Sequence, residues 1–378
     1  MIAAAKRPKR SALRVTVVGA GAFGGWTALH LQRSGAKVTL VDAWGAGNSR
    51  ASSGGETRVI RSIYGGDPDY IRWVERSFVL WRQMKPQLYF RTGALWMFSA
   101  EDSYARKSLP LVKSPVDQLS PSEAAKRFPQ VNFTGINSVY FEHEAGFVLA
   151  RRGCQVVQQA FVDADGTFRI EAIPAPVNVA KIAKDADVVV FACGPWLGKL
   201  FPDVIGNLVS PSRQEVFFFG TAPGDRRFID FPVWVDFGER IFYGVPGNES
   251  RGFKVADDTR GEPVDPTTLE RVPSAEGLAR ARQKLAQRFP ALADAPLTES
   301  RVCQYENSPD GNYIIDRHPA ASNVFLVGGG SGHGYKLGPA LGEYVASVIL
   351  GRRQLMERFR LGRLENRKEK PKTQMEHA

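Results

Sequence analysis

The stretch VTVVGAGAFG, residues 15–24, decides the fold, because an apolar β-branched run leads directly into a glycine-rich turn. The residues after it predict a helix up to about Ser34, and Gly35 lies where a helix-terminating glycine belongs. A second β-branched run, residues 37–41, predicts another strand, which ends at Asp42. This strand-helix-strand unit is typical of the Rossmann-like, doubly wound parallel α/β fold that binds dinucleotides.

The turn carries the pattern G-x-G-x-x-G at Gly19, Gly21 and Gly24. The first glycine makes a tight turn, the second lets the backbone approach a pyrophosphate, and the third lets the helix pack against the strand. The free N–H groups and the dipole at the helix N-terminus favour that anion. Asp42, 18 residues after Gly24, is placed to accept hydrogen bonds from a ribose diol, which favours FAD or NAD over NADP.

A second strand-to-helix junction near the C-terminus is richer still in glycine. Residues 323–327 predict a buried strand, and five of the seven residues 328–334 are glycine. We expect the next helix to run from about Gly338 to Leu350. The glycine loop before it should form a second anion site, which would suit the edge of a flavin ring that becomes negative on reduction. Lys336 at the mouth of this loop is poorly explained by packing, whereas His333 suits a hydrogen-bonded loop histidine as well as a chemical role.

The middle of the chain has a different pattern. Between about Ser210 and Val302, short aromatic strands alternate with Gly and Pro turns, which predicts an antiparallel sheet. We therefore expect an antiparallel-sheet substrate domain inserted into the α/β domain and covering its active face. The FAD-binding domain is predicted to be discontinuous, with residues 1–84, 141–205 and 303–378, and the substrate domain to hold residues 85–140 and 206–302.

Earlier in the chain, Asp69 is expected to cap a helix with apolar positions from Ile71 to Trp81, and Ser120 and Glu123 form a predicted capping box.

Composition excludes several classes of protein. With 378 residues, 43% hydrophobic and 24% charged, the chain is globular and too long for one core of about 250–300 residues. No apolar run reaches the 18 residues of a membrane helix, so we expect no membrane partner. Cys154, Cys193 and Cys303 are too few and too scattered for a disulfide framework or a zinc site. We expect no metal and a reduced, cytoplasmic setting.

The net charge of +11 lies at the two ends of the chain. Residues 1–14 contribute +5, and residues 351–378 hold nine Lys or Arg and four Glu, which gives another +5. The remaining residues therefore carry only 11 − 10 = +1. A nucleic-acid binding site is a basic patch on a folded face. We therefore interpret the two ends as solubilising tails and expect no nucleic-acid partner. The alternative is an RNA-associated flavin protein.

Considered as single residues, the remaining candidates have ordinary explanations. Arg58 and Arg61 suit solvated surface charges, and Lys254 on a short predicted strand suits an exposed edge. Cys303 suits a buried, inert thiol.

The order of the motifs resembles the glycine/D-amino-acid oxidase family of flavoproteins, and most closely its monomeric sarcosine oxidase branch, which includes N-methyltryptophan, pipecolate and fructosyl-amino-acid oxidases. The resemblance runs from about Arg14 to Gly351. It rests on VTVVGAGAFG, SSGGETRVIR, FYGVP with Lys254 after it, VCQYENSPDGNYIIDRHP and GGGSGHGYKLGP. It implies a flavin amine oxidase with FAD as its cofactor.

The resemblance also implies residue roles. Cys303 is then joined covalently to the flavin 8α carbon, and Arg61 and Lys336 grip the substrate carboxylate. Lys254 lies on the opposite face of the flavin and assists oxygen, because a fixed ammonium stabilises the charge that develops on oxygen. Arg58 lies by the flavin.

This sequence departs from the branch at two histidine positions, which hold Gly54 and Asp258. The loss of two imidazoles implies a wider cavity, and the aspartate would attract a cationic substrate group. Residues 155–187 also look shortened, which implies a trimmed sheet in the FAD-binding domain.

The implied reaction is oxidation of the C–N bond of a carboxylate-bearing amine to an imine, with O₂ reduced to H₂O₂. The substrate is expected to be an N-methyl, cyclic imino or amino acid larger than sarcosine, and the protein a monomer or small homo-oligomer. A dehydrogenase that uses another electron acceptor is the alternative, against which Lys254 argues. The expected catalytic residues are Arg58, Arg61, Tyr243, Lys254, Asp258, Tyr305 and Lys336. The expected cofactor-binding residues are Gly19, Gly21, Ala22, Phe23, Gly24, Asp42, Thr57, Cys303, Gly330, Gly332, His333, Gly334 and Lys336.

Overall fold

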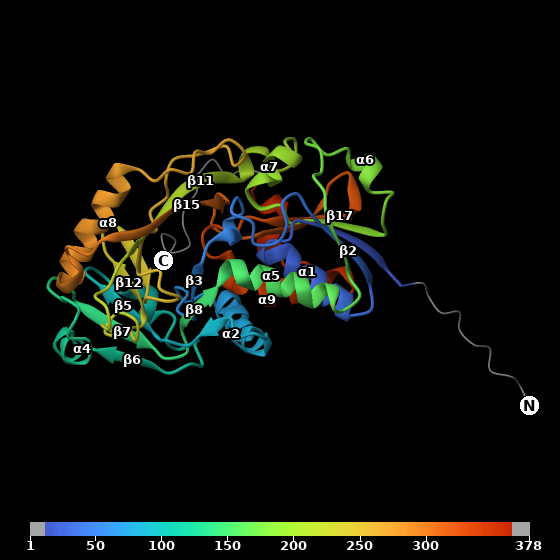
Figure 1. The fold of residues 1–378 in the computed structure, drawn as a ribbon. Coiled ribbons are helices and arrows are strands. Elements are labelled where there is room, and N and C mark those ends of the chain that lie inside the picture. The colour runs from blue at the N-terminus through green and yellow to red at the C-terminus, as the bar shows by residue number, and fades with distance from the viewer. Residues whose placement is uncertain (1–11, 365–378) are drawn as a thin grey trace, which may run out of the picture.

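A six-stranded sheet and an eight-stranded sheet occupy two lobes that lie side by side (Figure 1). A three-stranded sheet, with strands β3 (Thr57–Ile60), β8 (Gly146–Leu149) and β4 (Tyr89–Phe90) in that order, joins them. The structure is a computed structural model, and it describes residues 12–364.

The six-stranded sheet has the order β16-β17-β10-β1-β2-β9. Five of its strands are parallel, and β16 is antiparallel to β17. The apolar runs are buried because helices and loops cover both faces, as expected for a parallel sheet. The strands are β1 (Arg14–Val18), β2 (Lys37–Asp42), β9 (Thr167–Ile170), β10 (Val188–Phe191), β16 (Ile314–His318) and β17 (Ala321–Gly328).

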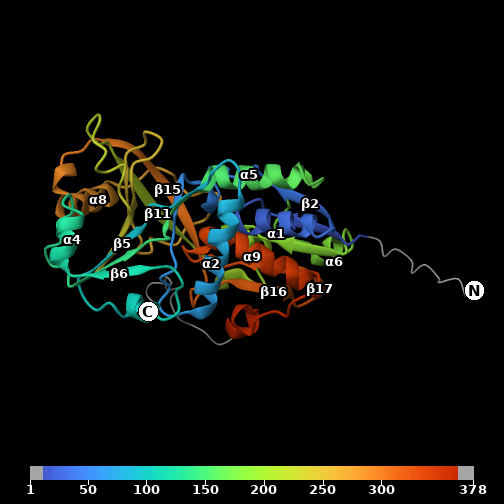
Figure 2. The same ribbon diagram turned by 90° about the horizontal axis from the view of Figure 1, so that it is seen from below.

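Four helices lie together on one side of this sheet, where α1 contacts α5 and α9, and α9 contacts α2 (Figure 2). They are α1 (Ala22–Arg33), α2 (Pro68–Gln83), α5 (Ala150–Val162) and α9 (Gly334–Ile349). Two short helices, α6 (Val179–Ile182) and α7 (Leu197–Leu200), lie on the opposite side. Between α5 and β10 the chain forms only β9 and α6.

Two helix starts differ from the sequence predictions. The cap of α2 is Asp67, whose Oδ1 accepts hydrogen bonds from Asp69 N and Tyr70 N at 3.1 Å each, because Pro68 occupies the first helical position. Helix α9 begins at Gly334, a turn earlier than predicted. A Cβ at Gly334 would lie 2.7 Å from the ring of Phe23, so glycine allows α9 to start against α1.

The eight-stranded sheet has the order β15-β11-β14-β13-β12-β5-β7-β6. The strands within residues 210–307 pair antiparallel, as predicted, whereas β12 and β5 are parallel neighbours, which the sequence pattern did not predict. The two strands are far apart in sequence, and no hairpin dictates their direction. The strands are β5 (Ala94–Phe98), β6 (Val116–Leu119), β7 (Ser138–Glu142), β11 (Ser210–Phe219), β12 (Val233–Phe237), β13 (Ile241–Val245), β14 (Phe253–Asp257) and β15 (Leu297–Asn307).

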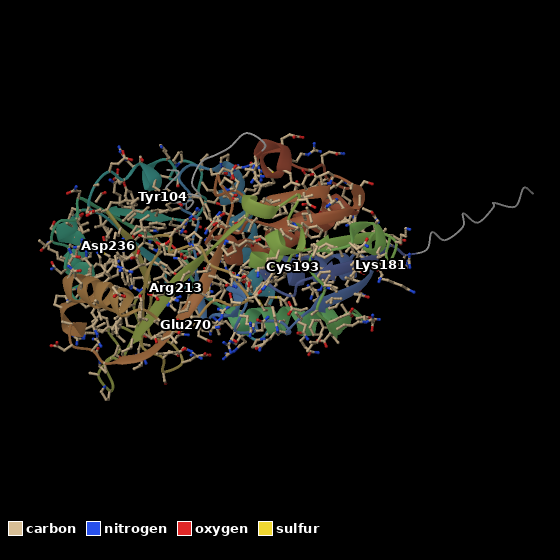
Figure 3. All side chains as sticks on the ribbon, turned by 90° about the horizontal axis from the view of Figure 1, so that it is seen from above. Tyr104, Lys181, Cys193, Arg213, Asp236 and Glu270 are labelled. Carbon is tan, nitrogen blue, oxygen red and sulfur yellow. The ribbon has the colours of Figure 1, made fainter. Side chains whose placement is uncertain are left out.

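Helices α3 (Ser103–Arg106), α4 (Pro121–Arg127) and α8 (Ala275–Arg288) accompany this sheet. The predicted capping box at Ser120 and Glu123 is confirmed at the start of α4. Asp236 of β12 accepts hydrogen bonds at 2.8 Å from Lys284 and Arg288 and so ties α8 to the sheet (Figure 3).

The long strands β11 and β15 reach from the eight-stranded sheet to the other lobe (Figure 1). The predicted domain boundary at 302/303 falls within β15, and the one at 140/141 falls within β7. The division into domains stays a prediction.

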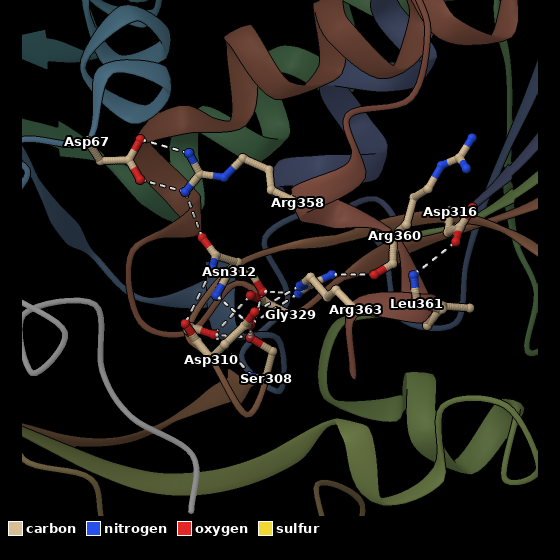
Figure 4. A network of polar contacts seen from close by, with 12 residues as sticks. Asp67, Ser308, Asp310, Asn312, Asp316, Gly329, Arg358, Arg360, Leu361 and Arg363 are labelled. Atoms are coloured by element: carbon tan, nitrogen blue, oxygen red, sulfur yellow. Dashed lines mark hydrogen bonds and ion pairs between the residues drawn. The ribbon is translucent and has the colours of Figure 1, made fainter. Parts of the chain in front are cut away.

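The C-terminal arginines that the structure describes are structural, which corrects part of the prediction that residues 351–378 form a tail. Arg358 Nη1 donates to Asp67 at 3.0 Å, and Arg363 Nε donates to Asp310 at 2.9 Å (Figure 4). These pairs hold the last described turn against α2 and against the turn after β15. The basic stretches 1–11 and 365–378 lie outside the described residues.

Candidate active site

Two adjoining cavities lie at the junction of the two lobes. The larger has a volume of about 430 Å³ and is the cofactor cavity of the following paragraphs. The smaller has a volume of about 80 Å³ and is termed the cation cavity, because five lysine and arginine side chains line it. The residues that line both are Arg58, Tyr305, Gly332 and Tyr335, so the two spaces are continuous.

The predicted residues divide between the two cavities. The cofactor cavity is lined by Gly19, Gly21, Ala22, Phe23, Asp42, Gly330, Gly332 and Gly334. The cation cavity is lined by Arg58, Arg61, Tyr243, Lys254, Asp258, Cys303, Tyr305, His333 and Lys336. Gly24 and Thr57 line neither cavity.

The glycine turn after β1 has the steric demands that the sequence predicts. Gly19 has φ +104°, and a Cβ there would lie 2.3 Å from the carbonyl oxygen of Ala192. A Cβ at Gly24 would lie 1.8 Å from the carbonyl oxygen of Gly19, so α1 can pack this closely only with glycine. At Gly21 the atom nearest to such a Cβ is Ser53 Oγ at 3.4 Å, an ordinary contact distance. The turn is thus least crowded at its second glycine, which lines the cofactor cavity where a phosphate group would approach.

Asp42 lies at the carboxyl end of β2 beside this turn. Its Oδ2 accepts a hydrogen bond from Ala20 N at 2.8 Å, and its Oδ1 accepts from Trp44 N and Gly45 N at 2.9 Å each. A carboxylate has about four acceptor positions. Three backbone donors therefore leave room for one further hydrogen bond from a ligand hydroxyl.

Three buried polar atoms in the cofactor cavity lack a hydrogen-bond partner among residues 12–364: Ser52 Oγ, Gln304 Oε1 and Glu306 Oε1. An unpaired buried polar atom costs about 1–3 kcal/mol, so such a cluster indicates a polar ligand. The hydroxyl-bearing ribityl chain of FAD offers donors of the kind these acceptors need. The residues present therefore fit FAD.

Gln304 and Glu306 were not predicted from the sequence to be site residues. They alternate with Cys303 and Tyr305 along β15, so one face of the strand lines the cofactor cavity and the other lines the cation cavity, where Tyr305 also reaches the shared space. Burial raises the pKa of Glu306 to about 7. The signal available in the sequence was this period of two, with polar residues at positions where a buried strand normally has apolar ones.

The glycine loop before α9 is held by His333. Its Nδ1 lies 2.9 Å from the hydroxyl of Tyr313, and its Nε2 lies 3.0 Å from the carbonyl oxygen of Gly311. Because a carbonyl only accepts, Nε2 carries the proton, and burial keeps the pKa of the ring well below its usual value. The turn that presents Gly311 is braced by the Arg363–Asp310 pair (Figure 4). This arrangement favours the structural interpretation of His333.

Arg61 and Lys336 lie together at one end of the cation cavity, with 5% and 6% of their surfaces exposed. The guanidinium carbon of Arg61 lies 4.4 Å from the ring centre of Tyr64, and Lys336 Nζ lies 5.3 Å from the same ring. Lys336 Nζ also donates to the carbonyl oxygen of His333 at 3.2 Å. Within residues 12–364, no carboxylate lies within ion-pair distance of either cation. Arg61 is therefore not a solvated surface charge.

Burial lowers the pKa of Lys336 well below its usual value, and the neighbouring Arg61 lowers it further. A bound anion would relieve both effects. Tyr64 was not predicted to be a site residue. The available signal was an aromatic residue three positions after Arg61, because a cation is attracted to the face of an aromatic ring.

Lys254 lies on β14, which is an interior strand between β11 and β13, so it is not an exposed edge lysine. Only 2% of its surface is exposed, and its Nζ donates to the carbonyl oxygen of Thr57 at 3.1 Å. Burial lowers its pKa to about 7, with Arg58 nearby as a smaller cause.

Arg58 and Cys303 are in contact. Nη2 of Arg58 lies 3.4 Å from the Sγ of Cys303 and donates to the carbonyl oxygen of Ser52 at 2.6 Å. Cys303 is buried, with 8% of its surface exposed, yet it lines the cation cavity beside a guanidinium.

Asp258 follows β14 directly and is the acidic member of the cavity. Its Oδ1 accepts a hydrogen bond from the hydroxyl of Tyr305 at 2.6 Å. Burial raises the pKa of Asp258 to about 6, although the hydrogen bond and the positive charges of Arg61 and Lys336 act to lower it. Tyr243 lies beside this pair and also has a pKa raised by burial.

Known proteins are similar to this chain in sequence and in fold. The monomeric sarcosine oxidase of Bacillus sp. (strain B-0618) is 30% identical, covering 89% of this chain and 92% of its own. The N-methyl-L-tryptophan oxidase of Salmonella enteritidis PT4 is 26% identical, covering 92% and 98%. A modified fructosyl peptide oxidase from Aspergillus nidulans has a similar fold, with a TM-score of 0.81 at 18% identity over 93% of this chain and 94% of its own.

The family described as FAD dependent oxidoreductase matches residues 14–348, from β1 to the end of α9. The glycine turn, the unpaired acceptors of the cofactor cavity and this match agree with one another, and the chain belongs to the FAD dependent oxidoreductase family.

Proposed function

We propose that this protein is an FAD-dependent amine oxidase that acts on a carboxylate-bearing amine and uses O₂ as its electron acceptor. The observation that carries the proposal is the burial of Arg61 and Lys336 side by side without a carboxylate partner among the described residues. Buried cations are stabilised by an anion in direct contact, and no carboxylate among residues 12–364 lies at that distance from either side chain, so a ligand carboxylate can take this position. A substrate carboxylate satisfies both.

The two cations orient the substrate as well as bind it. Arg61 presents a planar fork and Lys336 a point charge, and together they fix a carboxylate in position and direction. The carbon and nitrogen next to that carboxylate are then held within the space that the two cavities share. Bound FAD supplies the redox chemistry, because it accepts two electrons from the C–N bond and passes them on to oxygen.

Lys254 supplies the charge for the oxygen reaction. Its ammonium is buried, held by the carbonyl oxygen of Thr57 and fixed on an interior strand. Such a preorganised charge stabilises the negative charge that develops on oxygen as it accepts the first electron. This supports oxygen rather than another electron carrier as the acceptor. A dehydrogenase is the alternative, and the rate at which the reduced enzyme reacts with O₂ distinguishes the two.

We expect the substrate to be an N-methyl, cyclic imino or amino acid larger than sarcosine. The relatives named for sarcosine and N-methyl-L-tryptophan support a secondary amine next to a carboxylate. Asp258 adds a negative charge to the cation cavity, whereas Gly54 lines neither cavity. No helix within residues 12–364 has the length and apolar character to cross a membrane. We propose a cytoplasmic monomer or small homo-oligomer without a nucleic-acid partner.

A peroxide-coupled screen of purified protein tests the proposed function. N-methyl amino acids, cyclic imino acids and amino acids with large side chains are the three substrate arms, and each is paired with its carboxylate-free counterpart. We expect H₂O₂ from at least one carboxylate-bearing arm and at least about tenfold less from its counterpart. A colourless protein, or equal turnover with and without the carboxylate, would refute the proposal.

The covalent link has its own prediction. Cys303 lines the cation cavity beside Arg58, and we propose that its sulfur is bonded to the flavin 8α carbon. The intact mass of acid-denatured wild-type protein should then include FAD, whereas the Cys303→Ala protein should release all its flavin in acid. Cys154→Ala is the matched control, since Cys154 is also buried but lies on α5, and it should keep the bound flavin. Flavin lost from wild-type protein in acid contradicts the link and leaves the oxidase proposal intact.

A further inference from the structure

Four carboxylates line the cation cavity, and three of them are neutralised by arginine. Glu56 lies 3.3 Å from Arg301, Glu215 lies 2.8 Å from Arg213, and Asp257 accepts a hydrogen bond from Arg240 Nε at 2.9 Å. Asp258 has no basic side chain within ion-pair distance among residues 12–364. Its carboxylate, which is 9% exposed, is the unpaired negative charge of the cavity.

The groups that face Asp258 come from several elements. They are Tyr305 of β15, Tyr243 of β13, Tyr104 of α3, Arg61 after β3, Lys336 of α9 and the neighbouring Asp257. The hydroxyl of Tyr305 binds Oδ1, and the two cations stabilise the ionised carboxyl from a distance. Asp258 is therefore an anion at neutral pH, held in place by one hydrogen bond and without a counterion.

This charge pattern matches a zwitterion. An amino acid arrives with a carboxylate and an ammonium, and its nitrogen must be neutral when the C–N bond is oxidised, because the lone pair has to be available. Arg61 and Lys336 attract the carboxylate but oppose the ammonium next to it. A proton acceptor in the same cavity removes that conflict.

We propose that Asp258 pairs with the ammonium of the bound substrate and takes its proton. An N–H bond of the ammonium breaks, an O–H bond forms on Asp258, and the electron pair stays on nitrogen, so that no oxidant or reductant is consumed. The inference rests on the proposed function, since it assumes an amine bound by its carboxylate. It makes Asp258 a general base for the reaction.

A binding experiment on the holoprotein isolates the charge interaction from turnover. The probes are trimethylglycine and 3,3-dimethylbutanoate, which have the same shape and the same carboxylate but differ in a permanent positive charge on the central atom. Binding is measured from the change in the flavin absorbance spectrum. Wild-type protein should bind trimethylglycine roughly tenfold more tightly, and Asp258→Asn should abolish this preference while changing the affinity for 3,3-dimethylbutanoate less than about twofold.

A pH profile then tests the proton transfer. Asp258 accepts a proton only when ionised, so the wild-type kcat/KM should fall as the pH drops through its pKa of about 6. The kcat/KM of Asp258→Asn should not show this fall at low pH, which is called the acidic limb of the profile. At pH 7 its kcat/KM should be about 10²-fold below wild type, and it should rise as the pH approaches the pKa of the free amine. Tyr305→Phe removes a hydrogen bond that lowers the pKa of Asp258, so it should move the limb to higher pH. Asp257→Asn removes a neighbouring charge that is already paired and should keep the limb.

The outcomes separate the inference from the proposed function. If neither probe binds wild-type protein, the carboxylate site itself is wrong. If both bind equally well, with Asp258→Asn unchanged, the role of Asp258 is wrong and the carboxylate site stands. If Asp258→Asn lowered kcat/KM only for substrates that carry a second cation in the side chain, the role of Asp258 as proton acceptor would also be wrong. If Asp258→Asn does not bind FAD, the Tyr305→Phe variant is the test. An acidic limb of its kcat/KM profile at the same pH as in wild type contradicts the proposal.

Discussion

Lys254→Met is expected to lower the rate constant for the reaction of the reduced enzyme with O₂ by about 10²–10³-fold, the cost of losing one preorganised charge at a developing anion. The rate at which substrate reduces the flavin should change far less, because substrate binding is assigned to Arg61 and Lys336. Stopped-flow mixing of anaerobically reduced protein with O₂ measures the first rate constant, and anaerobic mixing with substrate measures the second.

The pH dependence of the same reaction gives a second readout. Burial lowers the pKa of Lys254 to about 7. The ammonium exists below its pKa, so the wild-type oxygen rate should decline as the pH rises above that value, whereas Lys254→Met should show no such decline. Lys113→Met is the control, since the side chain of Lys113 is 87% exposed. An oxygen rate in wild-type protein no faster than that of free reduced flavin would favour the dehydrogenase.

Arg61→Ala is expected to lower kcat/KM for a carboxylate-bearing amine by about 10³-fold, because it leaves the bound carboxylate with Lys336 as its one cationic partner in a buried site. Steady-state kinetics with a matched pair of amines, with and without the carboxylate, measures the effect. The carboxylate-free amine should lose less than about tenfold, since it never used the guanidinium.

Arg226→Ala is the matched control for this variant. Arg226 pairs with Asp230 between β11 and β12, lines neither cavity, and its side chain is 71% exposed. It should keep kcat/KM within about threefold, as expected for an exposed ion pair. Equal losses for both amines in Arg61→Ala would show that the arginine supports the fold of the site rather than the substrate carboxylate.

Local patterns in the sequence were sufficient for the cofactor half of the protein. The strand, turn and helix of residues 15–33 are contiguous, Gly19 has a positive φ of +104°, and the third glycine of the turn, Gly24, packs against the first, Gly19. The same holds for the capping box of α4. The start of α9 was predicted a turn late, because Phe23, which lies against Gly334, is more than 300 residues away in the chain.

The cation cavity could not be predicted from spacing. Arg61, Lys254 and Lys336 come from three separate elements, and only the order of strands in the eight-stranded sheet makes Lys254 interior. Considered alone, Lys254 was better explained as an exposed lysine on an edge strand. Only the family resemblance indicated that it belongs to the active site. The parallel pairing of β5 with β12 was missed for the same reason, because long-range partners leave no mark on local periodicity.

The central claim is that a buried pair of cations selects an amine by its carboxylate and presents it to the flavin. Anaerobic mixing of the holoprotein with a carboxylate-bearing secondary amine, and in parallel with its carboxylate-free counterpart, tests this claim most directly through the loss of flavin absorbance. The account predicts that the first amine bleaches the flavin at least about a hundredfold faster than the second. Bleaching at the same rate by both amines would contradict it.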